Sequence, residues 1–344
     1  MNKQLALVLN GPKDFSYEEK EIKRPVDDEV MIKVHNVSVC GSDVNAINGR
    51  MPLFEFPRII GHEVSGVVEE VGGKASNLKV GDRVCLMPCK SCEHCLACRH
   101  GEPNACESLK LYGVKLDGGL QQYLTLPEKY FLRLPDSVSI ENASLVEPLT
   151  IGMHATSMLG EVKGDKVLVL GAGPIGLCCA QVLKAKGAEV YCADASNERI
   201  AFVEERFGFK VFDVKASDYK EVLKKTTGGE GFYGVVDTTG NINSMRNAYQ
   251  TVGQTGKVVL VGINKEDMIF NEADFHYKEA TLFTTRNSNI KDYQAVLELI
   301  ANGSIKPEKM ITHRTKFSEA KDEMLKQAEN PSKYFKHIIC LVSD

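Results

Sequence analysis

The chain contains cysteines at spacings that suit a metal ion. Four of them form a C-x-x-C-x-x-C-x7-C pattern in a short segment that also holds glycine and proline: Cys92, Cys95, Cys98 and Cys106. Thiolates at these intervals can surround one ion, and zinc in tetrahedral coordination is its natural occupant. The spacing alone does not fix the ligands, because three more donors lie in the same segment: Cys89, His94 and His100. We expect a structural zinc site here.

A second set of ligand types is scattered along the first half of the chain. Its members are Cys40, His62, Glu63 and Glu147. Cys40 follows an alternating apolar stretch and His62 precedes another, so both lie at the ends of expected strands. Glu147 is an acid among apolar neighbours, and a buried carboxylate needs a partner such as a metal. Spacing alone leaves a catalytic metal site and ordinary core packing equally open.

A glycine-rich turn indicates a dinucleotide site. An apolar run, Lys166 to Leu170, opens into Gly171, Gly173, Pro174, Ile175 and Gly176, and a helical pattern follows. In this motif a pyrophosphate lies at the helix N-terminus, where backbone N–H groups and the helix dipole favour it. Asp194 ends the next apolar strand and can accept hydrogen bonds from both ribose hydroxyls, which favours NAD. Arg199 is close enough in sequence to leave NADP open.

Composition limits the remaining possibilities. The chain has 344 residues, 43% hydrophobic and 26% charged content and a net charge of -4, as expected for a globular protein with two domains. This charge gives no general attraction to nucleic acid or anionic lipid. We find no signal-like or membrane-spanning segment and expect a cytoplasmic protein. The eleven cysteines are therefore expected to be thiols or metal ligands, with Cys178, Cys179 and Cys192 as packing residues.

Taken together, these motifs resemble the zinc-containing medium-chain dehydrogenases, the superfamily of alcohol, sorbitol and threonine dehydrogenases. The resemblance covers essentially the whole chain and also rests on three short motifs, Cys40-Gly41-Ser42-Asp43, Gly61-His62-Glu63 and Asp117-Gly118-Gly119. It implies a catalytic zinc held by Cys40, His62 and Glu147, with Glu63 nearby as an alternating ligand or a neighbour of the ligands. It also implies a structural zinc held by Cys92, Cys95, Cys98 and Cys106, with Cys89 outside. Glutamate at position 147 resembles the polyol dehydrogenase branch.

The resemblance also implies roles for the residues after Cys40. Ser42 is expected to bond the substrate oxygen and carry its proton outward, while Asp43 orients His62. Many relatives have a histidine five residues after the zinc cysteine, but this chain has Asn45 there. An amide cannot titrate, so the proton must leave through water, the ribose hydroxyls or another group.

The expected fold class is α/β, with a Rossmann-type doubly wound parallel sheet domain and a β-rich GroES-like catalytic domain. We expect the catalytic domain at residues 1–152, the NAD-binding domain at residues 153–287 and a return to the catalytic domain at residues 288–344. The strands expected in the nucleotide domain are Val167 to Leu170, Glu189 to Cys192, Gly234 to Asp237 and Val258 to Val261. The final segment is expected to add two helices and the strand His337 to Val342.

The resulting hypothesis is a zinc-dependent oxidoreductase that transfers hydride from a secondary hydroxyl to NAD. Resemblance to bacterial dehydrogenases favours the C5 hydroxyl of sugar acids such as L-galactonate or L-gulonate, with Arg58 and Arg286 as candidate carboxylate partners. A polyol such as sorbitol, or threonine, remains an alternative. A zinc-dependent binding module that senses nucleotide is a hypothesis from a different class. Relatives form dimers and tetramers, so we expect a homo-oligomer.

Overall fold

The computed structural model describes residues 3–51 and 54–342. They fall into two compact units that divide the chain between Glu147 and Pro148 and again between Ile305 and Lys306. The first unit combines the N-terminal part with the C-terminal tail, and the second is Pro148–Ile305. Residues 148–152 and 288–305, which the sequence analysis placed with the catalytic domain, thus pack with the second unit. None of the described helices has both the length and the apolar character needed to cross a bilayer.

The second unit is built on a parallel six-stranded sheet in the order β12-β11-β10-β13-β14-β15. The strands are β10 (Lys166–Leu170), β11 (Glu189–Asp194), β12 (Lys210–Asp213), β13 (Phe232–Asp237), β14 (Val252–Leu260) and β15 (Thr281–Thr284). The four expected strands are all present, and β12 and β15 extend the sheet at its two edges. The order reverses between β10 and β13, which is where doubly wound sheets bind ligands.

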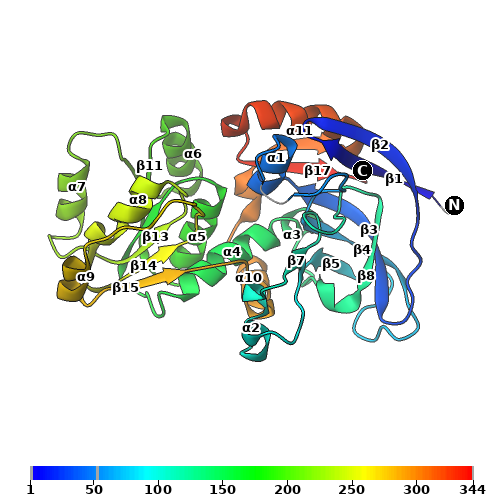
Figure 1. Cartoon of the computed structure of the whole chain (residues 1–344), viewed down its shortest axis with the longest axis horizontal. Coiled ribbons are helices and arrows are strands. Elements are labelled where there is room, and N and C mark those ends of the chain that lie inside the picture. Colours follow the sequence, from blue (N-terminus) through cyan, green and yellow to red (C-terminus); the bar gives the residue numbers. More distant parts are fainter. Residues whose placement is uncertain (1–2, 52–53, 343–344) are drawn as a thin grey trace. The chain divides into compact units, whose positions relative to one another are not determined.

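Helices connect and flank these strands, as Figure 1 shows in colours from green to orange. They are α4 (Val146–Ser157), α5 (Pro174–Ala185), α6 (Asn197–Phe207), α7 (Tyr219–Thr226), α8 (Ile242–Asn247), α9 (Glu272–Lys278) and α10 (Ile290–Ala301), with the short helix η3 (Ala248–Thr251). Helix α5 is apolar enough to be buried, and its Cys178 and Cys179 are 0% exposed. With Cys192 at 1% exposure, the three cysteines are packing residues as expected.

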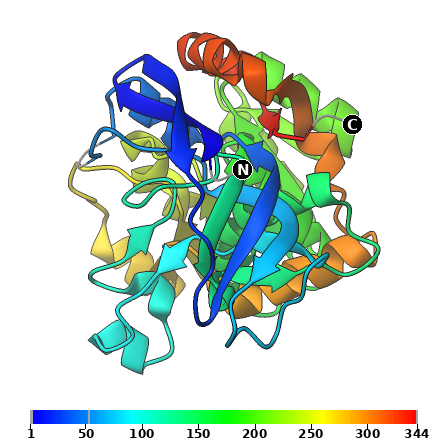
Figure 2. The same ribbon diagram turned by 90° about the vertical axis from the view of Figure 1, so that its right-hand side faces the viewer.

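The first unit contains a seven-stranded sheet in the order β16-β17-β3-β4-β5-β9, with β8 also paired to β3. The strands are β3 (Glu29–Ser38), β4 (Glu63–Val71), β5 (Arg83–Leu86), β8 (Tyr123–Pro127), β9 (Phe131–Arg133), β16 (Ile311–Lys316) and β17 (Lys336–Cys340). The C-terminal strand β17 pairs antiparallel with β3, so the tail returns to the first unit as expected. Figure 2 turns this unit toward the viewer, with the blue N-terminal strands and the red tail in one body.

Smaller elements complete the first unit. They are the hairpin strands β1 (Lys3–Gly11) and β2 (Asp14–Glu21), the short strands β6 (Cys89–Lys90) and β7 (Lys110–Leu111), the helices α1 (Gly41–Ile47), α2 (Leu96–Arg99), α3 (Ile140–Ala143) and α11 (Ala320–Glu329), and the short helices η1 (Pro103–Ala105), η2 (Glu128–Tyr130), η4 (Pro307–Met310), η5 (Phe317–Glu319) and η6 (Pro331–Lys333). Strands β3 and β4 are mostly buried, and their apolar side chains belong to one core. No disulfide joins any of the eleven cysteines, all of which lie within the described residues.

Candidate metal and dinucleotide sites

Three scattered ligand types converge where β3 ends and β4 begins. Cys40 is the N-cap residue of α1 and His62 immediately precedes β4, whose first residue is Glu63. Because β3 and β4 are antiparallel and Ser38 pairs with Glu63, the residues just beyond this pair meet at one sheet edge. One donor atom from each of Cys40, His62 and Glu63 lies within 4.8 Å of the other two. The geometry thus collects a thiol, an imidazole and a carboxylate, a donor set that zinc accepts.

Glu147 belongs to the electrostatic environment of this cluster but not to the group of three. It is 8% exposed, and burial raises the pKa of its carboxyl to about 7. The nearby His62 and Lys336 act to lower that pKa, while Glu63 raises it. A third carboxylate, Asp43, is also buried, and burial raises its pKa. So many buried acids in one place favour a bound cation, which would offset their charge.

His62 adds a second indication of a cation. Burial would lower the pKa of the His62 imidazole, but Asp43 and Cys40 together raise it well above its ordinary value. Its Nδ1 atom is 3.8 Å from Asp43 Oδ1 and is buried without a hydrogen-bond partner among the described residues. A buried imidazole with one unsatisfied nitrogen, beside a thiol and carboxylates, fits a metal ligand. The residues at this position therefore suit zinc, with Asp43 beside His62 as the resemblance implied.

A buried lysine that the sequence analysis missed contacts Glu63. Lys336 Nζ donates to Glu63 Oε1 and to Glu63 Oε2, both at 2.6 Å. The side chains are 2% and 0% exposed, so the pair is excluded from water. Thr312 Oγ1 donates to the Lys336 carbonyl oxygen at 3.1 Å and holds the start of β17. Both oxygens of Glu63 are thus engaged by a cation that belongs to the chain itself.

The Asp117-Gly118-Gly119 motif fastens the segment that precedes His62. Gly118 N donates to Ile59 O at 2.7 Å and Gly119 N donates to Gly61 O at 2.8 Å. A Cβ atom on Gly118 would lie 2.2 Å from Gly61 O, so only glycine fits this approach. Asp117 Oδ1 accepts from the Ile59 N–H and from Arg58 Nη1, each at 3.2 Å. Arg58, a candidate for substrate binding, is therefore engaged in holding its own loop.

The segment from Cys92 to Cys106, the cysteine lobe, brings four thiols together. The sulfur atoms of Cys92, Cys95, Cys98 and Cys106 all lie within 4.8 Å of one another. Cys89, on β6, is outside this group, and His94 Nδ1 instead contacts the Cys92 carbonyl oxygen at 2.7 Å. The group contains the four residues that the resemblance implied, and four thiols at this separation suit tetrahedral zinc.

Backbone N–H groups stabilise thiolate in the lobe. Cys92 N donates to Cys106 Sγ at 3.3 Å, and Cys95 N donates to Cys92 Sγ at 3.4 Å. Hydrogen bonds from His94 N–H, and then from Cys95 N–H, lower the pKa of Cys92 to about 6, while burial raises the pKa of Cys98 to about 11. Without a cation the four thiols thus cannot all ionise near neutral pH, and a bound divalent ion would relieve this conflict.

The glycine turn of the second unit leaves a place for a ligand. Gly171 has φ +93°, and a Cβ there would lie 2.7 Å from Thr238 Oγ1. A Cβ on Gly176 would lie 1.8 Å from Gly171 O, because α5 packs tightly against the turn. A Cβ on Gly173 would instead meet nothing closer than Arg199 Nη1 at 3.6 Å. The protein itself does not require glycine at position 173, and the approach of a pyrophosphate explains it.

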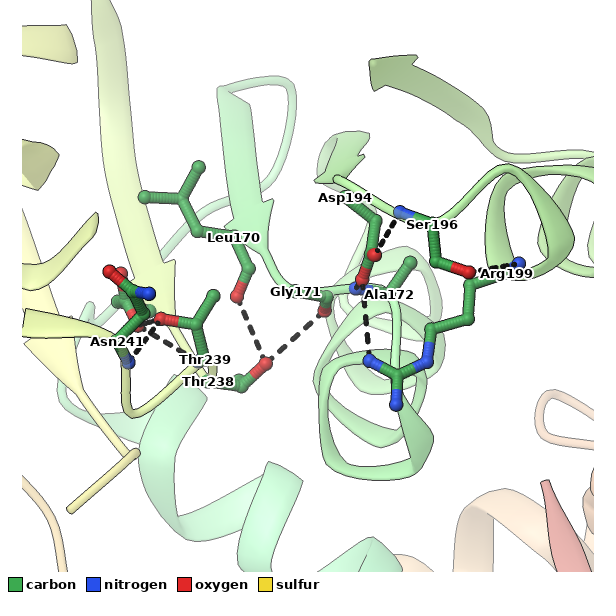
Figure 3. A network of polar contacts seen from close by, with 10 residues as sticks. Leu170, Gly171, Ala172, Asp194, Ser196, Arg199, Thr238, Thr239 and Asn241 are labelled. Atoms are coloured by element: carbon green, nitrogen blue, oxygen red, sulfur yellow. Dashed lines mark hydrogen bonds and ion pairs between the residues drawn. The ribbon is translucent and has the colours of Figure 1, made fainter. Parts of the chain in front are cut away.

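Asp194 is fixed beside this turn by two backbone groups (Figure 3). Its Oδ2 accepts from Ala172 N at 2.7 Å and its Oδ1 accepts from Ser196 N at 2.8 Å. Arg199 Nη1 lies 3.7 Å from Asp194 Oδ2, and its side chain remains 41% exposed. Each carboxylate oxygen has a further lone pair, so Asp194 can also accept from ribose hydroxyls.

A cavity of about 250 Å³ lies at the carboxyl ends of β14 and β15. Val261, Ile263, Met268, Thr284 and Thr285 are among the residues that line it. Thr285 Oγ1 is buried and has no hydrogen-bond partner among the described residues, so it can bond a ligand. Asp194 ends β11, and the cavity lies on the other side of the point between β10 and β13 where the strand order reverses. The cavity therefore suits the second half of an extended dinucleotide.

Two family descriptions match the chain. Residues 26–136 match "Alcohol dehydrogenase GroES-like domain" and residues 174–302 match "Zinc-binding dehydrogenase". Together with the relatives described next, they show that the chain belongs to the zinc-containing medium-chain dehydrogenase/reductase family. It is therefore an oxidoreductase, which excludes the hypothesis of a nucleotide-sensing binding module as its function. The α/β fold with a Rossmann-type and a GroES-like domain is confirmed.

Similar proteins cover nearly the whole chain. L-galactonate-5-dehydrogenase of Escherichia coli (strain K12) is 35% identical over 98% of this chain and 99% of its own length. Probable D-xylulose reductase A of Neosartorya fischeri is 31% identical over 92% of this chain and 91% of its own length. A crystal structure of an alcohol dehydrogenase from E. coli CFT073, complexed with NADH, has a TM-score of 0.92 and 30% identity. That alignment covers 99% of this chain and 100% of the other.

Proposed function

We propose that this protein oxidises a secondary hydroxyl of a sugar acid with NAD, with L-galactonate or L-gulonate as the best candidates and C5 as the reacting carbon. The observation that carries the proposal is the cluster of Cys40, His62 and Glu63 donor atoms within 4.8 Å. The relative named L-galactonate-5-dehydrogenase, aligned over 98% of the chain, supports this substrate class. Its 35% identity supports the class of substrate more strongly than the individual compound.

In this proposal Cys40, His62 and Glu147 hold the catalytic zinc. Glu147 is preferred over Glu63 because both oxygens of Glu63 already accept from Lys336. Bound zinc would supply a Lewis acid that acidifies a substrate hydroxyl, and bound NAD would supply the hydride acceptor. Cys92, Cys95, Cys98 and Cys106 hold a second zinc with a structural role.

The chain's own residues would orient the substrate and move its proton. Asp43 Oδ2 accepts from the Cys40 N–H at 2.9 Å, so Asp43 is fixed while it faces His62. At 3.8 Å from His62 Nδ1, this carboxylate is proposed to orient the imidazole through its charge. Ser42, in the first turn of α1, is proposed to accept the hydroxyl proton and pass it to solvent. Asn45, exposed on the same helix, cannot continue that path by titration.

The coenzyme would bind along the second unit. Gly173 accommodates the pyrophosphate at the N-terminus of α5, together with the turn residues Gly171, Pro174, Ile175 and Gly176. Asp194 is proposed to bind the adenosine ribose and to repel the additional phosphate of NADP, so NAD is preferred. The cavity lined by Thr284 and Thr285 would take the nicotinamide half. The Arg58 side chain is only 16% exposed, whereas Arg286 is exposed to solvent, so Arg286 is the better candidate for the substrate carboxylate.

A substrate panel tests the proposal. The purified protein is assayed with NAD and equal concentrations of L-galactonate, L-gulonate, sorbitol and L-threonine, and NADH formation is followed by absorbance. We expect kcat/KM for a sugar acid to exceed the others by at least ~10-fold, about the contribution of one carboxylate bond. Replacement of Arg286 by Gln should reduce this preference, and Lys291→Gln serves as a control at another basic position. A clear preference for the uncharged compounds contradicts the sugar-acid proposal.

A polyol dehydrogenase is the second candidate. The relative named probable D-xylulose reductase A, at 31% identity, supports it. A polyol has no carboxylate, so in this case the Arg286→Gln change should leave kcat/KM unchanged. The same panel therefore separates the two candidates.

We further propose that the protein is a homo-oligomer. Strand β15 forms one edge of the six-stranded sheet, and an unpaired strand edge can pair with a second chain. Nearby, Ile269 and Tyr277 are 66% and 78% exposed, which is unusual for large apolar side chains. Light scattering of the intact protein at micromolar concentration should give a dimer or tetramer, and a monomer contradicts the proposal.

A further inference from the structure

Helix α4 carries two buried polar contacts to the segment that follows β15. Thr150 Oγ1 and Ser288 Oγ are 2.7 Å apart, and His154 Nδ1 lies 3.0 Å from Asp292 Oδ2. All four residues are buried, with exposures of 0%, 6%, 5% and 7% in that order. Since a carboxylate only accepts, His154 Nδ1 carries the hydrogen. Four polar side chains buried for no visible catalytic purpose indicate a specific connection between α4 and residues 288–292.

Asp292 also fixes the backbone of this segment. Its Oδ2 accepts from Asn289 N at 2.8 Å, and Asn289 Oδ1 accepts from Asp292 N at 3.4 Å, which together form the capping box of α10. The rim of the cavity, Thr284 and Thr285, is therefore followed within a few residues by two anchored positions. The N-terminus of α10 and the cavity rim are held to α4 as one segment.

On another side, α4 is packed closely against the glycine-turn helix. A Cβ on Gly152 would lie 2.7 Å from the backbone carbon of Cys178 and 2.8 Å from Cys179 N. The two helices thus approach each other at backbone distance, and α5 begins at the glycine turn. Helix α4 therefore contacts both the helix that would hold the pyrophosphate and the segment that borders the nicotinamide cavity.

We propose that Thr150 and His154 are positioning residues that set the distance between the two halves of the coenzyme site. They do so by fixing Ser288 and Asp292, and with them the Thr284–Thr285 rim, relative to the glycine turn. This inference rests on the proposed use of NAD, because it concerns how the nicotinamide half is placed. A hydride transfer depends steeply on such placement, and a shift of about 1 Å can cost ~10²-fold in rate.

The experiment compares two substitutions on the same helix. Thr150→Val removes the hydroxyl that meets Ser288, while Thr156→Val removes an equally buried hydroxyl that donates only to the α4 carbonyl of Met153 at 3.2 Å. Both threonines are 0% exposed, so the loss of stability should be similar. Ser288→Thr retains a hydroxyl at the other end of the contact and serves as the conservative variant. Thermal unfolding of all variants verifies that they fold.

Two ligands, NADH and ADP-ribose, report on the two halves of the coenzyme site separately. NADH fluorescence reports the surroundings of the nicotinamide, and the chain has no tryptophan to obscure it. ADP-ribose lacks the nicotinamide and reports the other half. We expect Thr150→Val to weaken or abolish the fluorescence enhancement of bound NADH and to lower kcat by ~10- to 100-fold. ADP-ribose affinity should stay within about 3-fold, and Thr156→Val and Ser288→Thr should resemble the wild type.

Other outcomes overturn the inference. It fails if Thr150→Val and Thr156→Val give the same NADH fluorescence, or if Thr150→Val weakens ADP-ribose and NADH equally. A wild-type protein that binds NADH but turns over no sugar acid contradicts only the proposed substrate, because the fluorescence comparison still decides the role of Thr150. A protein that binds neither NADH nor ADP-ribose contradicts the coenzyme proposal and this inference together.

Discussion

Lys336 Nζ donates to both carboxylate oxygens of Glu63 at 2.6 Å, and both side chains are almost completely buried. The pair joins the first residue of β17 to the first residue of β4, so the tail of the chain completes the surroundings of His62. It also neutralises one of the carboxylates beside the proposed zinc ligands. A buried pair of this kind gains little over an apolar pair, but loss of one partner leaves an uncompensated charge.

Replacement of Lys336 by Met should therefore destabilise the protein by ~3–5 kcal/mol, because it leaves Glu63 buried without its cation. Urea unfolding measures the change, and Lys333→Met, at an exposed position three residues earlier, is the control. Lys336→Arg should restore much of the stability. In the cobalt-substituted protein, Lys336→Met should also change the visible absorption spectrum, because Glu63 is released to approach the metal. Equal stability of Lys336→Met and Lys333→Met would contradict this role.

Replacement of Asp194 by Ser should shift coenzyme preference from NAD toward NADP. The change removes the carboxylate that would repel the 2′-phosphate and leaves Arg199, now 3.7 Å from that carboxylate, able to bind it. We expect the ratio of kcat/KM for the two coenzymes to change by ~10²-fold or more. Asp213→Ser is a matched control, because Asp213 also ends a strand and accepts from a backbone N–H, that of Lys215. An equal shift in both variants argues against the assignment.

The sequence was sufficient to predict the elements with strong local signals. The glycine turn, the parallel strands beside it and the cysteine lobe all depend on residues that are close in the chain, and their spacing carries the information. The scattered set was harder, since spacing left Cys40 and His62 indistinguishable from core residues and only the resemblance related them to a metal. Their meeting depends on the antiparallel register of β3 and β4.

Lys336, by contrast, was missed for a physical reason. A single lysine before an apolar strand is normally at the surface, and only the pairing of β17 with β3 brings it to Glu63. The contacts of Thr150 and His154 with the α10 segment are likewise separated by 138 residues each. Arg58 was proposed as a carboxylate partner from resemblance and charge, and its contact with Asp117 in the fold could not be read from the sequence. Long-range polar pairs have no periodic signal in the sequence.

Replacement of Cys106 by Ser should remove the lobe zinc and leave the catalytic zinc. Cys106 is 0% exposed and accepts from Cys92 N, so the loss of its thiolate opens the group of four. Metal analysis should fall from about two zinc ions per chain to about one, and the melting temperature should fall by several degrees. Cys89→Ser, outside the group, should retain both ions. Retention of two ions by Cys106→Ser would contradict the ligand assignment.

Replacement of Asn45 by His should change the pH profile of kcat without abolishing activity. Asn45 is exposed on α1, three residues after Ser42, where an imidazole with an ordinary pKa near 6.5 could receive the proton. We expect the rising limb of kcat to move to lower pH and the wild-type enzyme to be accelerated by added buffer more strongly than the variant. The response of kcat to buffer concentration provides the control, because buffer can replace a missing proton acceptor on the protein. An unchanged profile and buffer response argue against proton exit at position 45.

His337 should make stability depend on pH. It is 0% exposed, and its Nδ1 and Nε2 atoms lie 2.7 Å from Gln327 Oε1 and 2.8 Å from Thr315 Oγ1. Burial, with a smaller contribution from His313, lowers the pKa of His337 to about 4. In the unfolded chain the pKa of this imidazole has its ordinary value near 6.5. Between about pH 4 and 6.5 the unfolded state therefore binds more protons than the folded state, so the free energy of unfolding rises with pH in this range. The contribution is complete above about 6.5 and is lost as the pH falls, by up to ~3 kcal/mol. Urea unfolding between pH 4.5 and 7 should show a smaller slope for His337→Gln than for the wild type, whereas His100→Gln, at an exposed position, should retain the full slope. Equal slopes in all three proteins would show that the pKa of His337 is the same in the folded and unfolded states, which contradicts the prediction.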